Sequence, residues 1–188
     1  MYSATTISRI WPQALESIAQ MVGSRTTVLS MHNIARQATE FNLAVGADPA
    51  GVDSYEQHFH RLNPWLNASQ SSVSGVVPGE AYVPYESLRR TEFFNDFGRK
   101  HGIVHTAAAV LDVEGSHVAY LSINRGEEMN KFSAAEMQMV ECLLPHLKRA
   151  LQISRHLDFA EDVKRSWDSL LAGMILIQDG RVHSFNSA

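Results

Sequence analysis

Apolar side chains recur every three or four residues along Lys131–Leu157, which predicts a long helix there. Ser133 and Glu136 have the spacing of a capping box, which marks the start of the helix. The helix has two neighbouring apolar stripes, whereas an ordinary surface helix has one. The first contains Met137, Val140, Leu144, Leu147 and Leu151, and the second contains Met139, Cys142, Leu143, Ala150, Ile153 and Leu157. Two stripes need two apolar partners, and we expect these to be the helix's own domain and a second copy of the chain.

The rest of the pattern predicts an α+β fold, with an antiparallel sheet flanked by helices. β-branched and apolar segments followed by short connections predict two antiparallel strand pairs. These pairs are Thr26–His32 with Glu40–Val45, and Val104–Asp112 with His117–Asn124. Helices are expected over Pro12–Val22, from Asp48 to about Leu62 and over Glu86–His101, with short extended pieces at Val76–Val77 and Ala81–Val83.

Small side chains occupy the centre of one predicted strand. Ala107 and Ala109 lie on one face of that strand and Ala108 on the other, because side chains alternate along a strand. Small residues there leave room for something on the sheet, either a bound molecule or helices that pack closely.

Length and composition limit the class of protein. The chain has 188 residues, 45% of them hydrophobic, which suits one domain with an extension and a buried core. Its net charge of −4 and its lack of a long basic run argue against direct contact with DNA. A single cysteine and the absence of a membrane-spanning run or a signal peptide predict a cytoplasmic protein with no membrane association.

The C-terminal part of the sequence predicts a connector and the start of a further domain. The long helix is expected to continue beyond Leu157 to about residue 173, and Met174–Ile177 and Arg181–Phe185 are expected to form a small hairpin. Two strands alone are marginal in water. We therefore expect a sensor domain over residues 1–157, a helical connector over 158–173 and a truncated segment over 174–188.

Several motifs resemble the N-terminal region of proteobacterial LuxR-type transcriptional regulators. They are Trp11-Pro12, Asn63-Pro64-Trp65-Leu66, Leu88–Phe97, Phe132-Ser133 and Leu143–Leu147. The resemblance implies a GAF-like sensor domain followed by a PAS-like segment from residue 174. It also implies a homodimer that binds a small molecule or a partner and signals through its C-terminal helix. The DNA-binding helix-turn-helix of such regulators has no counterpart here, so DNA would be contacted only through a domain absent from this sequence.

Aromatic residues between the two predicted strand pairs are candidates for a ligand pocket, since such pockets are mostly apolar with a few polar groups. The candidate ligand-binding residues are Tyr55, Phe59, Trp65, Tyr82, Tyr85, Phe93, Phe97 and His105, with His58 as a further polar candidate. Trp65 is the first choice among them. The alternative is that these aromatics form an ordinary core, because aromatic side chains are generally buried.

Catalytic and metal-binding motifs are missing from the sequence. His58 and His60 are two residues apart and would not face each other on a helix, and no Cys or carboxylate completes a metal site. Cys142 is expected to pack in a core or a dimer interface instead of reacting. We therefore predict no cofactor, no metal and no enzyme activity. A ligand-free dimerisation scaffold and a small-molecule-metabolising enzyme are the alternatives to a sensor.

The long helix is the predicted output of the sensor. Pro145 removes one backbone hydrogen bond from its interior and is expected to kink it. The residues predicted for the connector and dimer contact are Leu144, Pro145, Leu147, Leu151 and Leu157.

Overall fold

The computed structural model describes residues 7–68, 75–168, 175–178 and 181–185. Its centre is a five-stranded sheet with the order β2-β1-β5-β4-β3, in which all neighbouring strands are antiparallel. The strands are β1 (Thr26–Asn33), β2 (Ala38–Val45), β3 (Val76–Pro78), β4 (His105–Glu114) and β5 (His117–Arg125). The two strand pairs and the α+β class predicted from the sequence are confirmed.

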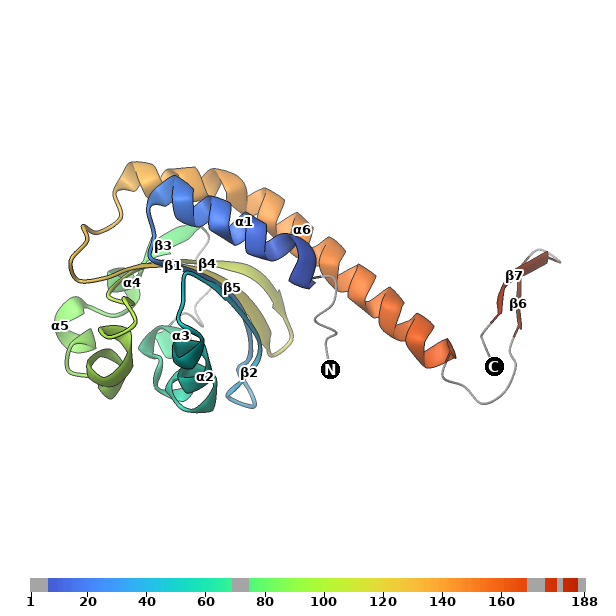
Figure 1. The fold of residues 1–188 in the computed structure, drawn as a ribbon, viewed down its shortest axis with the longest axis horizontal. Coiled ribbons are helices and arrows are strands. Elements are labelled where there is room, and N and C mark those ends of the chain that lie inside the picture. Colours follow the sequence, from blue (N-terminus) through green and yellow to red (C-terminus); the bar gives the residue numbers. More distant parts are fainter. Residues whose placement is uncertain (1–6, 69–74, 169–174, 179–180, 186–188) are drawn as a thin grey trace.

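Two helices, α1 (Ile7–Val22) and α6 (Ala134–Asp168), cover one face of the sheet (Figure 1). The main apolar core lies between them and the strands. Its buried side chains include Trp11, Leu15, Ile18, Leu29, Ala107, Ala109, Leu121, Ile123, Val140, Leu144, Leu147 and Leu151. Burial of such side chains is worth about 1.5–3 kcal/mol each for the larger aliphatic ones, so this layer supplies most of the apolar burial.

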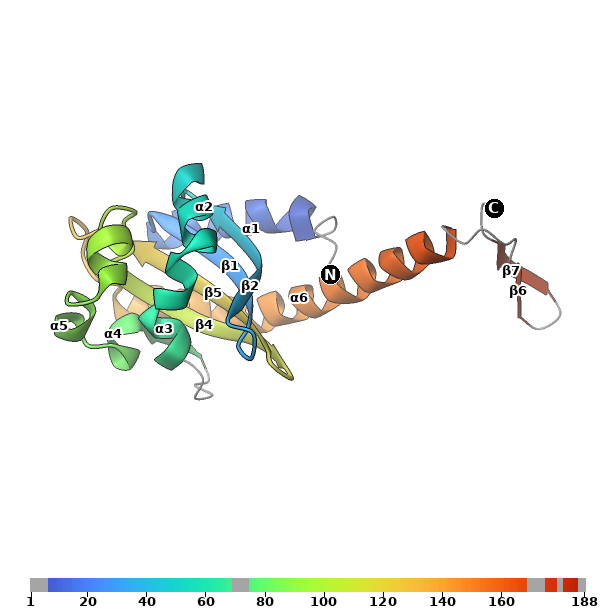
Figure 2. The same ribbon diagram turned by 90° about the horizontal axis from the view of Figure 1, so that it is seen from below.

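Short helices cover the opposite face of the sheet, as seen from below in Figure 2. In chain order they are α2 (Pro49–Gln57), η1 (Phe59–Leu62), α3 (Pro64–Ala68), α4 (Gly79–Tyr82), α5 (Tyr85–Leu88) and η2 (Phe93–Gly98). We call this layer the cap. Its side chains form a second, mainly aromatic cluster of Trp65, Leu88, Phe93, Phe94, Phe97 and Val104.

Three expectations for local structure were wrong. Helix α1 begins at Ile7 and contains Pro12 in its interior, and the extended piece expected at Ala81–Val83 is largely the helical turn α4. The helix expected over Glu86–His101 is divided into α5 and a π-helical turn, η2. Thr91 causes this division: its Oγ1 donates to Leu88 O at 2.6 Å and accepts from Phe94 N at 3.1 Å, and such side-chain bonds compete with helical ones.

The start of α6 is the predicted capping box. Ser133 N and Ser133 Oγ each donate to Glu136 Oε2 at 2.7 Å, and Glu136 N donates to Ser133 Oγ at 3.3 Å. These bonds satisfy donors that have no intrahelical partner. Sequence spacing alone therefore located this helix end.

The two apolar stripes of α6 have different environments. Leu144, Leu147 and Leu151 of the first stripe are buried in the core of their own domain. Their own sheet and α1 cover these side chains, and their predicted contribution to a dimer contact stays a prediction. The second stripe is largely exposed: Met139 is 44%, Ile153 50% and Leu157 49% accessible, and Cys142 is exposed too. Pro145 is also exposed, and the helix continues through it.

Arg125, at the end of β5, connects the helical layer to the sheet. Its side chain is only 8% exposed and pairs with Glu136 at 2.6 Å. The guanidinium also donates to the carbonyls of Val22 and Gly23 at the end of α1. It donates further to the carbonyls of Asn130 and Lys131 before α6, and lies 4.1 Å from the centre of the Phe132 ring. One buried charge therefore holds three chain segments.

The C-terminal strands β6 (Ile175–Gln178) and β7 (Arg181–Phe185) form a separate antiparallel pair, as predicted. The proposed boundary between residues 157 and 158 falls inside α6, which is one continuous helix to Asp168. The end of the predicted connector, residues 169–173, lies outside the described residues. No helix in the described part of the chain is long and apolar enough to cross a bilayer.

Replacing Arg125 tests the importance of this connection. We expect Arg125→Ala to lower the free energy of unfolding by about 3 kcal/mol, since it breaks a buried ion pair and leaves carbonyls without donors. Arg89→Ala is the matched control: Arg89 has an exposed pair with Glu86 at 3.7 Å, which is worth about 0–1 kcal/mol. Urea denaturation measures both, and equal effects of the two substitutions would contradict the role of Arg125.

Candidate functional site

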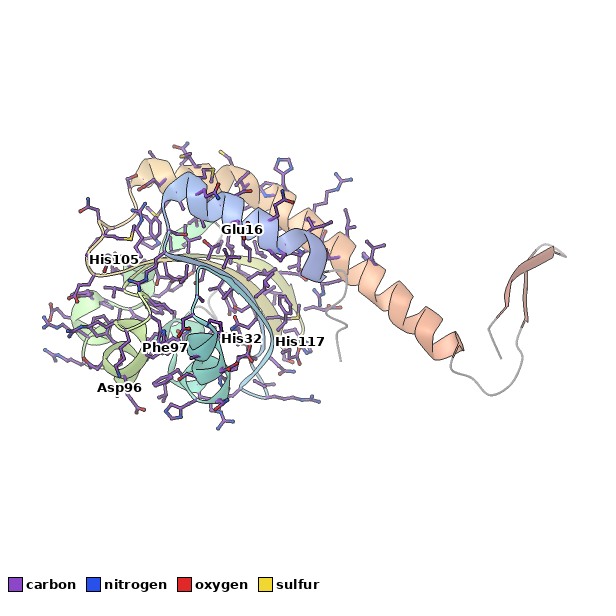
Figure 3. The ribbon with its side chains drawn as sticks, viewed as in Figure 1. Glu16, His32, Asp96, Phe97, His105 and His117 are labelled. Atoms are coloured by element: carbon purple, nitrogen blue, oxygen red, sulfur yellow. The ribbon has the colours of Figure 1, made fainter. Side chains whose placement is uncertain are left out.

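A cavity of about 350 Å³ lies between the sheet and the cap. Its floor comes from β1, β2, β4 and β5, and its roof comes from α2, α3, α4 and η2. Figure 3 shows His32 and Phe97 on this side of the sheet, away from α1 and α6. The volume is within the range of sites for small molecules.

Strand register explains the composition of the floor. Residues that are opposite each other in the sheet form rows across it, and alternate residues of each strand face the cavity. One row contains Thr26, Asn124 and Thr106, the next contains Ala44, Val28, Ser122 and Ala108, and a third contains Asn42, Ser30 and Tyr120. The middle row therefore has smaller and less polar side chains than the row of Asn42, Ser30 and Tyr120.

Asn124 connects the polar side chains of the first row. Its Oδ1 accepts a hydrogen bond from Thr106 Oγ1 at 2.9 Å, and its Nδ2 donates to Thr26 Oγ1 at 3.2 Å and Ser122 Oγ at 3.1 Å. The Asn124 side chain is 1% exposed. Buried amides need such partners, and here other floor side chains supply them. The Asn124 amide therefore does not need a hydrogen bond from a ligand.

The other polar end contains His32. Its Nε2 lies 3.2 Å from Ser30 Oγ and its Nδ1 lies 3.1 Å from Thr39 Oγ1. Burial and, secondarily, the neighbouring His60 lower the pKa of His32 from its ordinary value of 6.5 to about 4. The imidazole is therefore neutral at pH 7 and acts as a polar but uncharged part of the floor.

Asn42 adds a different property to the same end. It lines the cavity, and its Oδ1 is buried without a hydrogen-bond donor in the described part of the structure. A buried acceptor with no donor costs about 1–3 kcal/mol. Among the described residues of the floor, Asn42 Oδ1 is the buried side-chain atom that has no hydrogen-bond partner.

Aromatic rings form the roof. Tyr55 and Phe97 are 5.6 Å apart between ring centres, and Trp65 meets Phe93 edge-on at 5.7 Å. Two polar atoms of this layer have partners within the protein: Trp65 Nε1 donates to Gly79 O at 3.1 Å, and Tyr55 Oη accepts from Asn63 Nδ2 at 2.9 Å. Burial raises the pKa of Tyr55 to about 12, so it stays neutral and the roof offers mainly ring surface.

Gly79 allows Trp65 to lie against the sheet. A Cβ at this position would be 2.8 Å from Trp65 Nε1 and 3.2 Å from Thr106 Cβ. Any larger residue would push the indole away from β4. Glycine at this position therefore fixes one wall of the cavity.

The structure brings together five of the eight candidate pocket residues: Tyr55, Trp65, Tyr82, Phe93 and Phe97 line the cavity. Phe59, Tyr85 and His105 are outside the lining. Phe59 stacks behind Phe97 at 4.9 Å, and Tyr85 packs on Phe94 at 5.9 Å. His105 lies 3.8 Å from Glu80, and the exposed His58 pairs with Glu92 at 3.0 Å. Contact of any of these residues with a ligand stays a prediction.

Charged residues of the lining are at the surface. Arg25, Asp48 and Lys100 are exposed, so the interior of the cavity is polar without a fixed charge. Among the described residues no three His, Cys, Asp or Glu are grouped so that they could hold a metal ion.

Comparisons with solved structures identify the fold. The ligand-binding domain of VqsR from Pseudomonas aeruginosa matches with a TM-score of 0.63 at 14% identity, over 82% of this chain and 91% of that one. CepR2 from Burkholderia cenocepacia, described as an N-acylhomoserine-lactone-dependent LuxR family transcription factor, matches with a TM-score of 0.59 at 14% identity, over 84% of this chain and 90% of that one. The fold is that of a LuxR-type ligand-binding domain.

Escherichia coli SdiA matches with a TM-score of 0.51 at 13% identity, over 95% of this chain and 68% of that one. No protein-family model matches the sequence, and no curated protein is similar to it. The predicted architecture, with a long C-terminal helix on an antiparallel sheet, is thus confirmed, and it matches the LuxR-type fold. The sequences of the matched structures are only 13–14% identical to this chain.

The polar residues of the cavity floor were missed in the sequence, where only the small alanines of β4, the cap aromatics and His105 were noted. The signal was present as an alternation of polar and apolar residues in β1 and β5. Ser30 and His32 alternate with Leu29 and Met31, for example. Such alternation normally indicates one face in water. Here the cap covers the polar face, which only the tertiary structure reveals.

His32 makes stability depend on pH. Because its pKa is lowered in the folded protein, the unfolded chain binds this proton more readily, and stability is lost as the pH falls from 6.5 towards 4. We expect the free energy of unfolding to fall by about 2 kcal/mol more in the wild type than in His32→Gln between pH 7.5 and 5. Urea denaturation at the two pH values measures this, and parallel losses would contradict the assignment.

Proposed function

We propose that this chain is the sensory and dimerisation region of a cytoplasmic LuxR-type transcriptional regulator, and that it binds a small molecule between sheet and cap. The observation that carries the proposal is the cavity of about 350 Å³ in a domain with the LuxR-type ligand-binding fold. The interior offers hydrogen-bonded hydroxyls, amides and a neutral imidazole, which suit recognition more than chemistry. The proposal is therefore of binding without catalysis.

Signalling would pass through the sheet to α6. On one face of β4, Thr106 and Ala108 line the cavity. On the other face, Ala107 and Ala109 pack in the helical core. Helix α6 is attached along much of its length: Glu141 accepts from Val76 N at 2.8 Å, and Arg155 pairs with Asp112. A ligand that favours one arrangement of the floor would thereby bias α6 and the DNA-binding domain beyond it.

Dimerisation would use the exposed stripe of α6. Met139, Cys142, Ile153 and Leu157 recur at helical spacing and are not covered by their own domain. An apolar stripe of this kind on a soluble domain is typical of an interaction surface. The remaining segment, residues 174–188, would begin a PAS-like domain.

Ligand binding can be tested by filling the cavity. Ala108→Leu adds three heavy atoms to the middle row of the floor, and we expect it to remove a co-purified small molecule that the wild type carries. Val113→Leu is the matched control, because Val113 is on the same strand, 62% exposed and away from the cavity. Mass spectrometry of molecules released by heat denaturation measures occupancy. A wild type that releases nothing more than Ala108→Leu would favour a ligand-free scaffold.

The dimer can be tested with a charge on the exposed stripe. We expect Ile153→Glu to weaken self-association at least tenfold, since it buries a carboxylate in an apolar contact. Gln152→Glu adds the same charge at an exposed neighbouring position and should leave the dimer intact. Sedimentation over a range of micromolar concentrations separates the outcomes, and a monomeric wild type would refute dimerisation through α6.

A further inference from the structure

The floor of the cavity has two different polar ends. They differ in whether their buried polar atoms have hydrogen-bond partners among the described residues. The row of Thr26, Asn124 and Thr106 is closed by hydrogen bonds among its own members. The row that contains Asn42 and Ser30 is four residues away along β1, which corresponds to roughly 13 Å. There Ser30 is hydrogen-bonded to His32, whereas Asn42 Oδ1 is buried without a donor from the described part of the chain.

Between these ends the floor has small and mainly apolar side chains. They are Val28, Ala44, Ser122 and Ala108, and the rings of Tyr55, Trp65 and Phe97 belong to the roof. Flat rings pack well against aromatic side chains, so this middle part suits a planar body. The volume of about 350 Å³ lies within the range of small-molecule sites, which leaves room for two fused rings.

Charge restricts the ligand further. Asp48, Lys100 and Arg25 are exposed lining residues, and His32 is neutral inside, so a charged ligand would lose its hydration without a buried counter-ion. In the roof, Trp65 Nε1 already donates to Gly79 O, and the Tyr55 hydroxyl accepts from Asn63 Nδ2. Among the described lining residues, the side-chain oxygen of Asn42 is a buried acceptor without a donor.

We propose that the cavity selects an uncharged, planar-ring molecule with a hydrogen-bond donor at one end, and that Asn42 on β2 is the residue that selects this donor. The proposal rests on the proposed ligand-binding function and adds the chemical class of the ligand. The donor of the ligand bonds to the Asn42 side-chain oxygen, and its rings lie between the middle row and the roof.

Three probes of similar size separate the contributions of the rings, of the hydrogen-bond donor and of the charge to affinity. 2-Naphthol has a ring pair and a donor, 2-methoxynaphthalene has the rings without the donor, and 2-naphthoate has the rings with a charge. Isothermal titration calorimetry on the 188-residue chain should give a Kd for 2-naphthol about five- to tenfold lower than for 2-methoxynaphthalene, because one neutral hydrogen bond to a buried acceptor is gained. 2-Naphthoate should bind at least tenfold more weakly than 2-naphthol.

Two substitutions locate the donor site. Asn42→Leu should raise the Kd of 2-naphthol to that of 2-methoxynaphthalene and leave the latter unchanged. Val113→Leu, which alters an exposed residue of β4 away from the cavity, should keep the wild-type ratio. Ala108→Leu should weaken both neutral probes, which places their binding in the cavity.

Equal affinities of the wild type for 2-naphthol and 2-methoxynaphthalene would overturn the role of Asn42, and this comparison does not depend on how the variants fold. If both probes still lose affinity in Ala108→Leu, the cavity remains a binding site and only the donor proposal fails. Tighter binding of 2-naphthoate would overturn the uncharged class. Failure of all three probes, together with a molecule that co-purifies with the wild type, would refute the planar-ring class alone.

Discussion

The buried guanidinium of Arg125 is the contact on which the arrangement of layers depends. It satisfies carbonyls at the end of α1 and before α6, and it neutralises the Glu136 carboxylate that caps α6. The pKa of Glu136 is lowered to about 2, first by its hydrogen bond with Arg125 and then by Ser133. The capping box of α6, the ion pair of Arg125 with Glu136 and the end of β5 therefore form one unit. This unit sets the direction in which α6 leaves the sheet.

The sheet separates two environments that have little in common. On the helical side, leucines, isoleucines and alanines from the strands meet α1 and α6 in a continuous apolar core. On the cap side, the same strands present hydroxyls, amides and an imidazole to a cavity with an aromatic roof. Successive side chains of a strand point to opposite faces of the sheet. A residue's position in the strand therefore decides whether its side chain lies in the helical core or at the cavity.

Sequence reasoning found those features that local chemistry determines. The capping box at Ser133, the two strand pairs and the first stripe of α6 all depend on short-range spacing, and their predicted positions agree with the structure. Trp65 and Phe97 were selected because they are aromatic, and they do line the cavity.

Other features depend on contacts between distant segments. Arg125 at a strand end resembles any surface arginine in sequence, and nothing local shows that residues before and after it, such as Gly23 and Asn130, supply its acceptors. The polar floor was hidden for a related reason, because alternation in β1 does not reveal whether water or a cap covers the polar face. Thr91 ended a predicted helix through a side-chain bond that apolar periodicity does not register.

The three consecutive alanines of β4 give the domain two compartments that can be altered independently. Ala107 and Ala109 set how closely the helical core packs, while Ala108 sets the depth of the cavity on the other side of the same backbone. A change of size at residue 108 would alter which molecules fit without crowding α6, and a change at 107 or 109 would do the reverse. Cavity volume and helical-core packing are thus set at adjacent positions on opposite faces of one strand.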